Sequence, residues 1–182
     1  KLKKNLLNDK NSIIIFGGRF PLFLSSTYFN NQEGGIEGNK FKGVHINDND
    51  LKIEEGFKKS IEELSKNGVN VILIYPIPEP GWNIPYKVLN KFFVKKNKII
   101  NQNYVTTSYM VYKNRNKSSF DLLDSIKGEN IYRIYPHKLF CDNLIKKRCI
   151  THNDRDILYS DENHLSYKGS IMVTDLIMKE IK

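Results

Sequence analysis

The chain of 182 residues is 40% hydrophobic, 12% aromatic and 27% charged, a composition that excludes a disordered, collagen-like or linker-like protein. Its length fits one domain with a substantial core, and its longest dense apolar stretch, residues 69–75, is too short for the roughly 18 residues of a membrane span. The net charge is +9, but only five of the 29 cations are arginines, so the charge reflects a lysine-rich composition and we expect no nucleic-acid partner.

The first apolar run, residues 12–16, predicts a buried parallel strand because it is short, continuous and ended by Gly17 and Gly18. The residues after such a strand are candidates for a site loop. Residues 25–50 are rich in Ser, Asn, Gly and Asp without periodicity, and we expect an irregular connection there. The glycines within it follow no predicted strand, which argues against a dinucleotide-binding loop.

Helix and strand patterns alternate from residue 53 onward. Apolar residues recur at helical spacing over residues 53–64, and the Asn-Gly pair at 67–68 is a stop signal for that helix. Residues 69–75 predict a second buried strand, which a rigid, proline-rich loop follows at residues 76–85. A helix followed by a strand at this spacing is typical of α/β proteins.

The second half of the chain continues this alternation. It contains predicted helices at residues 86–94 and 118–126, a strand at 131–135, a very short strand at 157–159 and a final helix capped by Ser166. The residues of the final helix expected to face inward are Val173, Leu176, Ile177 and Ile181. The pattern predicts a single α/β domain with a parallel sheet.

Asp161 and His164 lie three residues apart on a predicted loop that leads into the final helix. A turn of that length can fold the carboxylate onto the imidazole Nδ1–H, which leaves Nε2 able to take a proton from a hydroxyl group. Such an Asp–His pair is the general base of a serine hydrolase or acyltransferase. A turn-ending aspartate followed by a surface or capping histidine is the alternative that the spacing leaves open.

The motif Asp-x-x-His-Leu-Ser-x-x-Gly at residues 161–169 resembles the last sequence block of SGNH-type esterases and acyltransferases. It looks most like the SGNH domain fused to membrane acyltransferases of family 3. The further matching segments are I-I-I-F-G-G-R-F at 13–20, V-I-L-I-Y-P-I-P-E-P-G-W at 71–82, the polar lead into a helix at 108–119, and the cysteine pair Cys141 and Cys149. The resemblance covers essentially the whole chain in order.

This resemblance implies a three-layer α/β/α domain of the flavodoxin-like SGNH fold, with a parallel sheet. It also implies an extracytoplasmic O-acyltransferase, in which an Asp–His pair activates a serine that passes an acyl group, typically acetyl, to a cell-envelope glycan such as lipopolysaccharide. The acyl donor would be delivered by a transmembrane acyltransferase domain in the same or a partner chain. That arrangement places the domain on the periplasmic or extracellular side of a bacterial inner membrane, with no cofactor and no metal.

The sequence departs from the family at the nucleophile, because residues 1–182 contain no Gly-Asp-Ser. In the family this block precedes the strand that residues 12–16 match, so we expect it upstream of Lys1. We therefore expect residues 1–182 to form an SGNH-like domain that is incomplete at its N-terminus, with the first strand missing. The serines Ser25, Ser26, Ser108 and Ser170 stand in the wrong sequence context for the nucleophile.

Gly18 and Arg19 are the candidates for oxyanion or substrate binding. The family's typical block with an oxyanion-hole asparagine is not recognisable in this sequence. A glycine after the first strand could offer a backbone N–H instead. Arg19 could lie near the acyl or glycan oxygen, and it could equally form a salt bridge behind the strand.

Cys141 and Cys149 enclose seven residues, and in an envelope protein a pair of cysteines favours a disulfide. A zinc site is the alternative, because His137 and His152 flank the pair and are suitable ligands, although the spacing matches no common zinc motif. Two free thiols are a third possibility.

Three functions therefore compete. The leading hypothesis is the O-acyltransferase, and the second is a carbohydrate esterase of the SGNH type, in which water takes the place of the sugar. The third is a catalytically inactive glycan-binding module, in which Trp82 and Tyr86 stack on sugars.

Overall fold

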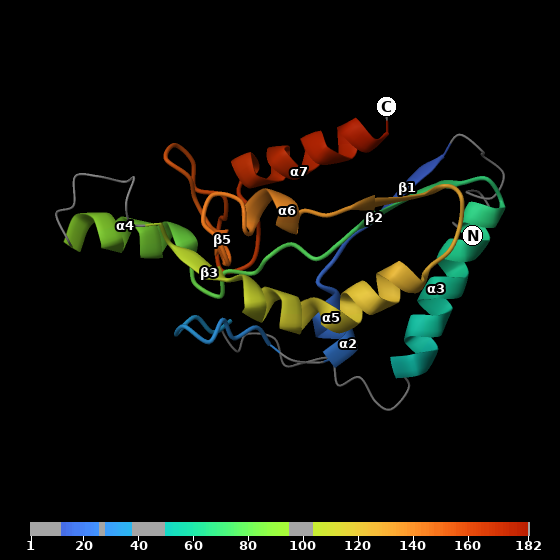
Figure 1. The fold of residues 1–182 in the computed structure, drawn as a ribbon, viewed down its shortest axis with the longest axis horizontal. Coiled ribbons are helices and arrows are strands. Elements are labelled where there is room, and N and C mark those ends of the chain that lie inside the picture. The colour runs from blue at the N-terminus through green and yellow to red at the C-terminus, as the bar shows by residue number, and fades with distance from the viewer. Residues whose placement is uncertain (1–11, 26–27, 38–49, 95–103, 182) are drawn as a thin grey trace. The chain divides into compact units, whose positions relative to one another are not determined.

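A computed structural model of the chain describes residues 12–25, 28–37, 50–94 and 104–181 (Figure 1). The structure divides into two compact units. Unit 1 comprises the described parts of residues 1–27, 43–76 and 116–135, and unit 2 those of residues 28–42, 77–115 and 136–182. No helix in these described ranges is long and apolar enough to cross a membrane.

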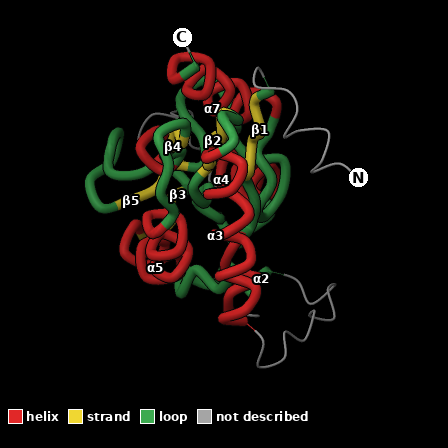
Figure 2. Tube along the Cα trace, turned by 90° about the vertical axis from the view of Figure 1, so that its right-hand side faces the viewer, coloured by secondary structure: helices red, strands yellow, loops and turns green. Residues whose placement is uncertain are grey.

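Unit 1 contains a three-stranded parallel sheet in the order β1-β2-β4. Its strands are β1 (Ile13–Phe16), β2 (Asn70–Ile74) and β4 (Ile131–Ile134). Ile14 pairs with Val71, and Val71 in turn pairs with Ile131, so β2 is the central strand (Figure 2). The parallel pairing confirms the predicted α/β class.

One face of the sheet forms the apolar core of unit 1. Alternate residues of β2 point to this face, because successive side chains of a strand point to opposite sides. They pack against α3 (Asp50–Lys66) and the unit 1 part of α5 (Tyr109–Ser125). The buried members of the cluster are Ile61, Leu64, Val69, Val71, Leu73, Tyr75, Leu123, Ile126 and Ile131.

The prediction that the first strand is buried is wrong for one of its faces. Ile14 and Phe16 pack on the core, but Ile13 and Ile15 are 45% and 51% exposed. β1 pairs with β2 alone among the described strands, and a short apolar run does not reveal whether its strand is central or at an edge.

The helices of unit 1 agree with the predictions in part. The amphipathic helix is α3, which ends where Gly68 adopts a φ of 84° and the Val69 N–H bonds to the Leu64 carbonyl, as at a glycine-ended helix C-terminus. The loop expected after β1 is short, because α2 (Phe20–Ser25) begins three residues after the strand. The helix predicted at 118–126 is α5, which begins at Tyr109.

Unit 2 contains α4 (Ile84–Val94), β3 (Thr106–Ser108), α6 (His137–Phe140), β5 (Arg148–Ile150) and α7 (Tyr167–Glu180). α4 and α7 match the predicted helices. β3 and β5 pair antiparallel, and neither was predicted (Figure 1). The strand expected at 157–159 is instead a pair of isolated bridges, from Ile157 to His152 and from Tyr159 to Leu165.

The final helix begins as its capping residue predicts. The Ser166 hydroxyl accepts a hydrogen bond from the Gly169 N–H at 3.2 Å and donates one to the Ile157 carbonyl at 2.6 Å. A side chain on Gly169 would stand 2.2 Å from the Leu158 carbonyl oxygen, so the close approach of these segments requires glycine. Val173 is buried as expected, but Ile181 is 37% exposed, which corrects the prediction that it faces inward.

A disulfide joins Cys141, at the end of α6, to Cys149 in β5. Both sulfur atoms are used in this bond, which rules out the zinc alternative and the free thiols. His152 is engaged as well, because its Nε2 accepts the Val105 N–H at 2.9 Å. Within the described ranges, no three His, Cys, Asp or Glu side chains are grouped so that they could hold a metal ion.

Candidate active site

Asp161 closes the turn that precedes α7. Its Oδ1 accepts hydrogen bonds from the backbone N–H groups of Asn163 at 2.8 Å and of His164 at 2.7 Å. Its Oδ2 lies 2.7 Å from Nδ1 of the same histidine. The Ser160 N–H bonds to the His164 carbonyl at 2.9 Å, which closes the turn from the other side. The spacing of three residues thus brings carboxylate and imidazole together within one turn, as the sequence analysis expected.

The hydrogen bond to Asp161 defines the state of the imidazole ring. A carboxylate accepts hydrogen bonds, so the proton of neutral His164 lies on Nδ1 and the lone pair on Nε2. The His164 side chain is 72% exposed, and no described residue bonds to Nε2. Burial raises the pKa of Asp161, but the N–H groups of Asn163 and His164 and the imidazole outweigh it and hold this pKa below its ordinary value.

The proline-rich loop that follows β2 holds this turn in place. The Gly81 N–H bonds to the Glu162 carbonyl at 2.9 Å, and the Ile84 N–H approaches the Asp161 carbonyl at 3.4 Å. The buried Tyr159 hydroxyl donates to the Pro78 carbonyl at 2.7 Å. Gly81 adopts a φ of 75°, a conformation that favours glycine. The two sequence segments that carried much of the resemblance therefore lie in contact.

Residues 28–37 add a third segment to this arrangement. Glu37 is only 7% exposed, and its carboxylate accepts from the Asn163 side-chain amide at 3.0 Å and from the Phe29 N–H at 3.3 Å. The fully buried Asn31 donates to the Pro80 carbonyl at 2.7 Å and accepts from the Gly35 N–H at 2.8 Å. Sequence reasoning missed both residues, because they stand in a segment without periodicity and Asn is abundant throughout the chain.

A buried ion pair lies under the same loop. Arg115 donates to Glu79 at 2.9 Å, and the two side chains are 9% and 7% exposed. The guanidinium also lies 5.4 Å from the centre of the Phe29 ring. These contacts connect the proline-rich loop, the unit 2 part of α5 and residues 28–37, and the side chains that make them are buried.

The other predicted site residues belong to other elements of the chain. Gly18 and Arg19 belong to unit 1, in the turn between β1 and α2, where a Cβ atom on Gly18 would meet no other atom within 4 Å. Ser108 caps α5, since its hydroxyl accepts the Val111 N–H at 3.3 Å. Ser170 lies within the first turns of α7. The side chains of Ser25 and Ser26 lie outside the described residues.

The geometry of unit 2 defines one chemical capability. An oriented, exposed imidazole with a free Nε2 can accept a proton from a hydroxyl group placed beside it, and the ionised Asp161 stabilises the imidazolium that results. The turn that carries the two residues is held by backbone bonds to the proline-rich loop and by the side-chain bond between Asn163 and Glu37, so the carboxylate is already placed before proton transfer.

Comparisons with known proteins agree with this fold. The model of the family described as "SGNH domain (fused to AT3 domains)" matches residues 1–179. Among solved structures, the periplasmic domain of the lipopolysaccharide acetyltransferase of Salmonella ser. Paratyphi A is similar, with a TM-score of 0.57 and 17% sequence identity. The similarity covers 98% of this chain and 60% of that one. No curated protein gives a significant match. At this identity the structural likeness concerns the fold alone.

Proposed function

The chain belongs to the family of SGNH domains fused to AT3 domains, and from this premise we propose that it contributes the proton-transferring half of an O-acyltransferase site that acetylates cell-envelope glycans. The observation that carries the proposal is the 2.7 Å hydrogen bond from the His164 Nδ1–H to the Asp161 carboxylate, beside an Nε2 to which no described residue bonds. The named activity of the similar Salmonella domain, lipopolysaccharide acetyltransferase, supports the choice of acyl group and acceptor.

The reaction proceeds in two steps. His164 Nε2 takes the proton of a serine hydroxyl as the serine oxygen attacks the acyl carbonyl, and the imidazolium returns that proton to the leaving group. Nε2 then takes the proton of a glycan hydroxyl as that oxygen attacks the acyl-serine ester, and the serine recovers its proton. Asp161 orients the ring and stabilises its charged form in both steps.

The serine in this proposal comes from outside residues 1–182, because these residues hold no Gly-Asp-Ser block. The acyl donor comes from a membrane-embedded acyltransferase domain, which the family description of fusion to AT3 domains supports. The domain then works on the periplasmic or extracellular side of the membrane, where a disulfide such as Cys141–Cys149 is stable.

Substitution of the pair in the full-length protein tests the proposal. His164→Ala removes the base, and we expect glycan acetylation to fall at least about a thousandfold, whereas Asp161→Asn weakens the orientation of the ring and costs about a hundredfold or more. Nuclear magnetic resonance of O-acetyl groups on the isolated glycan measures both. Asp175→Asn, the same chemical change on the exposed face of α7, is the control and should leave transfer unchanged.

Transfer that survives His164→Ala would overturn the assignment of the base. The esterase alternative uses the same residues, so it is separated by product analysis. With donor and glycan both present, an acyltransferase yields acetylated glycan, whereas an esterase yields free acetate and a deacetylated glycan.

A further inference from the structure

One residue of the active-site turn connects the Asp161 carboxylate to a distant segment of the chain. Asn163 donates its backbone N–H to Oδ1 of Asp161 at 2.8 Å and its side-chain amide to Oε1 of Glu37 at 3.0 Å. The other oxygen of Asp161 lies 2.7 Å from Nδ1 of His164. Three consecutive hydrogen bonds therefore run from Glu37 to the imidazole, and all four residues belong to unit 2.

Glu37 is suited to this role because its own carboxylate is fixed. The side chain is 7% exposed, and Oε2 accepts the Phe29 N–H at 3.3 Å while Oε1 accepts from Asn163. The backbone beside it is paired as well, since the Glu37 N–H bonds to the Phe29 carbonyl at 2.9 Å and Asn30 bridges to Ile36. Each carboxylate oxygen thus meets a donor in a buried position, where a hydrogen bond is stronger than in water.

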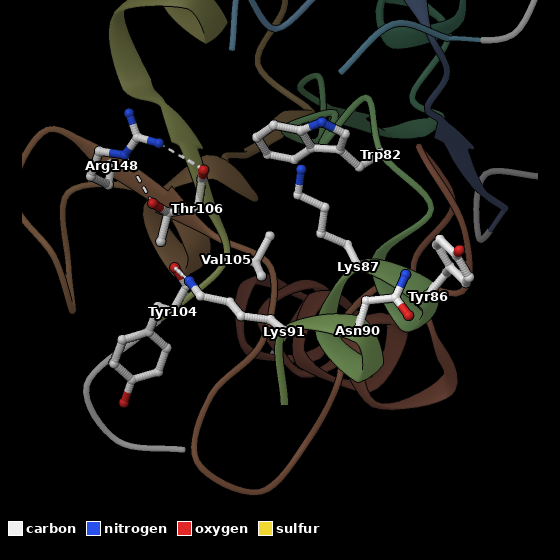
Figure 3. Close-up of a pocket in the computed structure, with 9 residues that line it drawn as sticks. All are labelled: Trp82, Tyr86, Lys87, Asn90, Lys91, Tyr104, Val105, Thr106 and Arg148. Carbon is white, nitrogen blue, oxygen red and sulfur yellow. Dashed lines mark hydrogen bonds between the residues drawn. The ribbon is translucent and has the colours of Figure 1, made fainter. Parts of the chain in front are cut away.

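Residues 28–37, the segment that carries this carboxylate, are anchored to the strand pair of unit 2. The Arg148 guanidinium in β5 makes two hydrogen bonds of 2.6 Å to the Glu33 carboxylate. Figure 3 shows the same guanidinium bonded to Thr106 of β3, at 2.9 Å to its hydroxyl and at 2.7 Å to its carbonyl. The segment also bonds to the proline-rich loop through Asn31. It is therefore fixed at several points besides its contact with the turn.

We propose that Glu37 is a positioning residue for acetyl transfer, and that it acts through Asn163 to hold the Asp161 carboxylate against Nδ1 of His164. The proton of the neutral ring then stays on Nδ1, and Nε2 is kept as the acceptor that a hydroxyl proton requires. In a looser turn this proton distributes over both nitrogens, and a ring that carries it on Nε2 cannot act as the base. The catalytic consequence rests on the proposed function, whereas the state of the ring does not.

Nuclear magnetic resonance of isotope-labelled imidazole nitrogens in the 182-residue chain measures this state, because protonated and unprotonated nitrogens differ in chemical shift. At about pH 8, where an imidazole of ordinary pKa is neutral, Nε2 of His164 should give the resonance of an unprotonated nitrogen. Asn163→Asp removes the amide donor and places a second carboxylate opposite Glu37, and Asn163→Ala removes the donor without adding a charge. In both variants the Nε2 resonance should shift towards its protonated value.

A double variant tests whether the bond itself is responsible. Glu37→Gln combined with Asn163→Asp exchanges donor and acceptor, so that the new glutamine amide donates to the new aspartate while its oxygen accepts the Phe29 N–H. In the full-length protein, Asn163→Asp should lower kcat for glycan acetylation about tenfold with KM unchanged, and the double variant should recover most of this loss and the ring state. Asn114→Asp, the same change at an exposed position of α5, is the matched control and should alter neither.

An Nε2 resonance that stays unchanged in both Asn163 variants would overturn the proposal, even if transfer were slower, because Glu37 would then support folding without orienting the ring. A double variant that restores neither the resonance nor the rate would also overturn it. Transfer that survives His164→Ala would overturn the proposed function alone, since the resonance reports the orientation of the ring whether or not the domain transfers acetyl groups.

Discussion

The parallel sheet of unit 1 and the loops around Asp161 in unit 2 are stabilised by different interactions. The sheet buries apolar side chains such as Val71 and Leu73 completely, and among the buried members of its core only Tyr75 makes a side-chain hydrogen bond, from its hydroxyl to Asp124. The loops instead bury polar groups, among them Asn31, Glu37 and Glu79, and connect each one by hydrogen bonds or ion pairs. The site region therefore depends on individual partners, whereas the sheet depends on packing.

This difference determines how each region should respond to substitution. Apolar cores tolerate changes that preserve volume, because dispersion and solvent exclusion have no strict geometry. A buried polar network loses more when one member is removed, since the remaining partner keeps its desolvation cost without its bond. Three measurements test this contrast.

The largest expected effect is at the Arg115–Glu79 pair. Arg115→Met removes the cation and leaves the Glu79 carboxylate in a site that is only 7% exposed. We expect the free energy of unfolding, measured by urea denaturation, to fall by about 3–5 kcal/mol. The double variant Glu79→Leu with Arg115→Met removes both charges and should recover most of this loss. A single substitution that costs less than about 1 kcal/mol would show that the pair behaves as a surface ion pair.

A smaller loss is expected in the sheet. Leu73 is fully buried in β2, the central strand of the sheet, and Leu73→Ala should lower the free energy of unfolding by about 3 kcal/mol through lost burial and the cavity left behind. Leu73→Met keeps the volume and should cost less than about 1.5 kcal/mol. A loss from Leu73→Met as large as that from Leu73→Ala would contradict the view that packing alone holds this region.

The same contrast explains what the sequence could predict. Apolar runs and amphipathic spacing are local signals, so β2, β4 and α3 were found close to their bounds. Edge position is set by which strands pair, and the exposed Ile13 and Ile15 of β1 were therefore missed. The three-residue strands β3 and β5 are too short for a periodic pattern, and their pairing joins segments some forty residues apart.

The site was predictable only where it is local. Asp161 and His164 are three residues apart, so the spacing and the family resemblance were enough to anticipate their contact. Their support comes from Glu37, more than a hundred residues away, and from backbone groups of the proline-rich loop. Hydrogen bonds between segments so far apart in the chain leave no periodic trace in a sequence, because they depend on the tertiary fold and not on local spacing.

The smallest of the three effects concerns acid. Burial, with the nearby Lys138 charge, lowers the pKa of His137 from 6.5 to about 4, and burial also lowers the pKa of His152. Between about pH 6.5 and pH 4 the unfolded chain then binds more protons than the folded one, so stability is present above this window and is lost as the pH falls through it. We expect His137 to contribute a loss of about 1–3 kcal/mol across it.

Urea denaturation at about pH 7 and about pH 5 measures this loss, and His137→Gln should reduce the difference while His152 retains its part. The contribution of the ionised Asp161 to stability is lost at a lower pH than that of the histidines. Its pKa is depressed, so its stabilising bonds are lost only as the pH falls through that depressed value. Both histidines lie in unit 2, so hydrogen exchange at mild acidity should increase first in residues 137–158 and not in β2. Equal increases in the exchange rates of β2 would show that mild acid destabilises the apolar core as well. That result would contradict the view that the two regions differ in their response to acid.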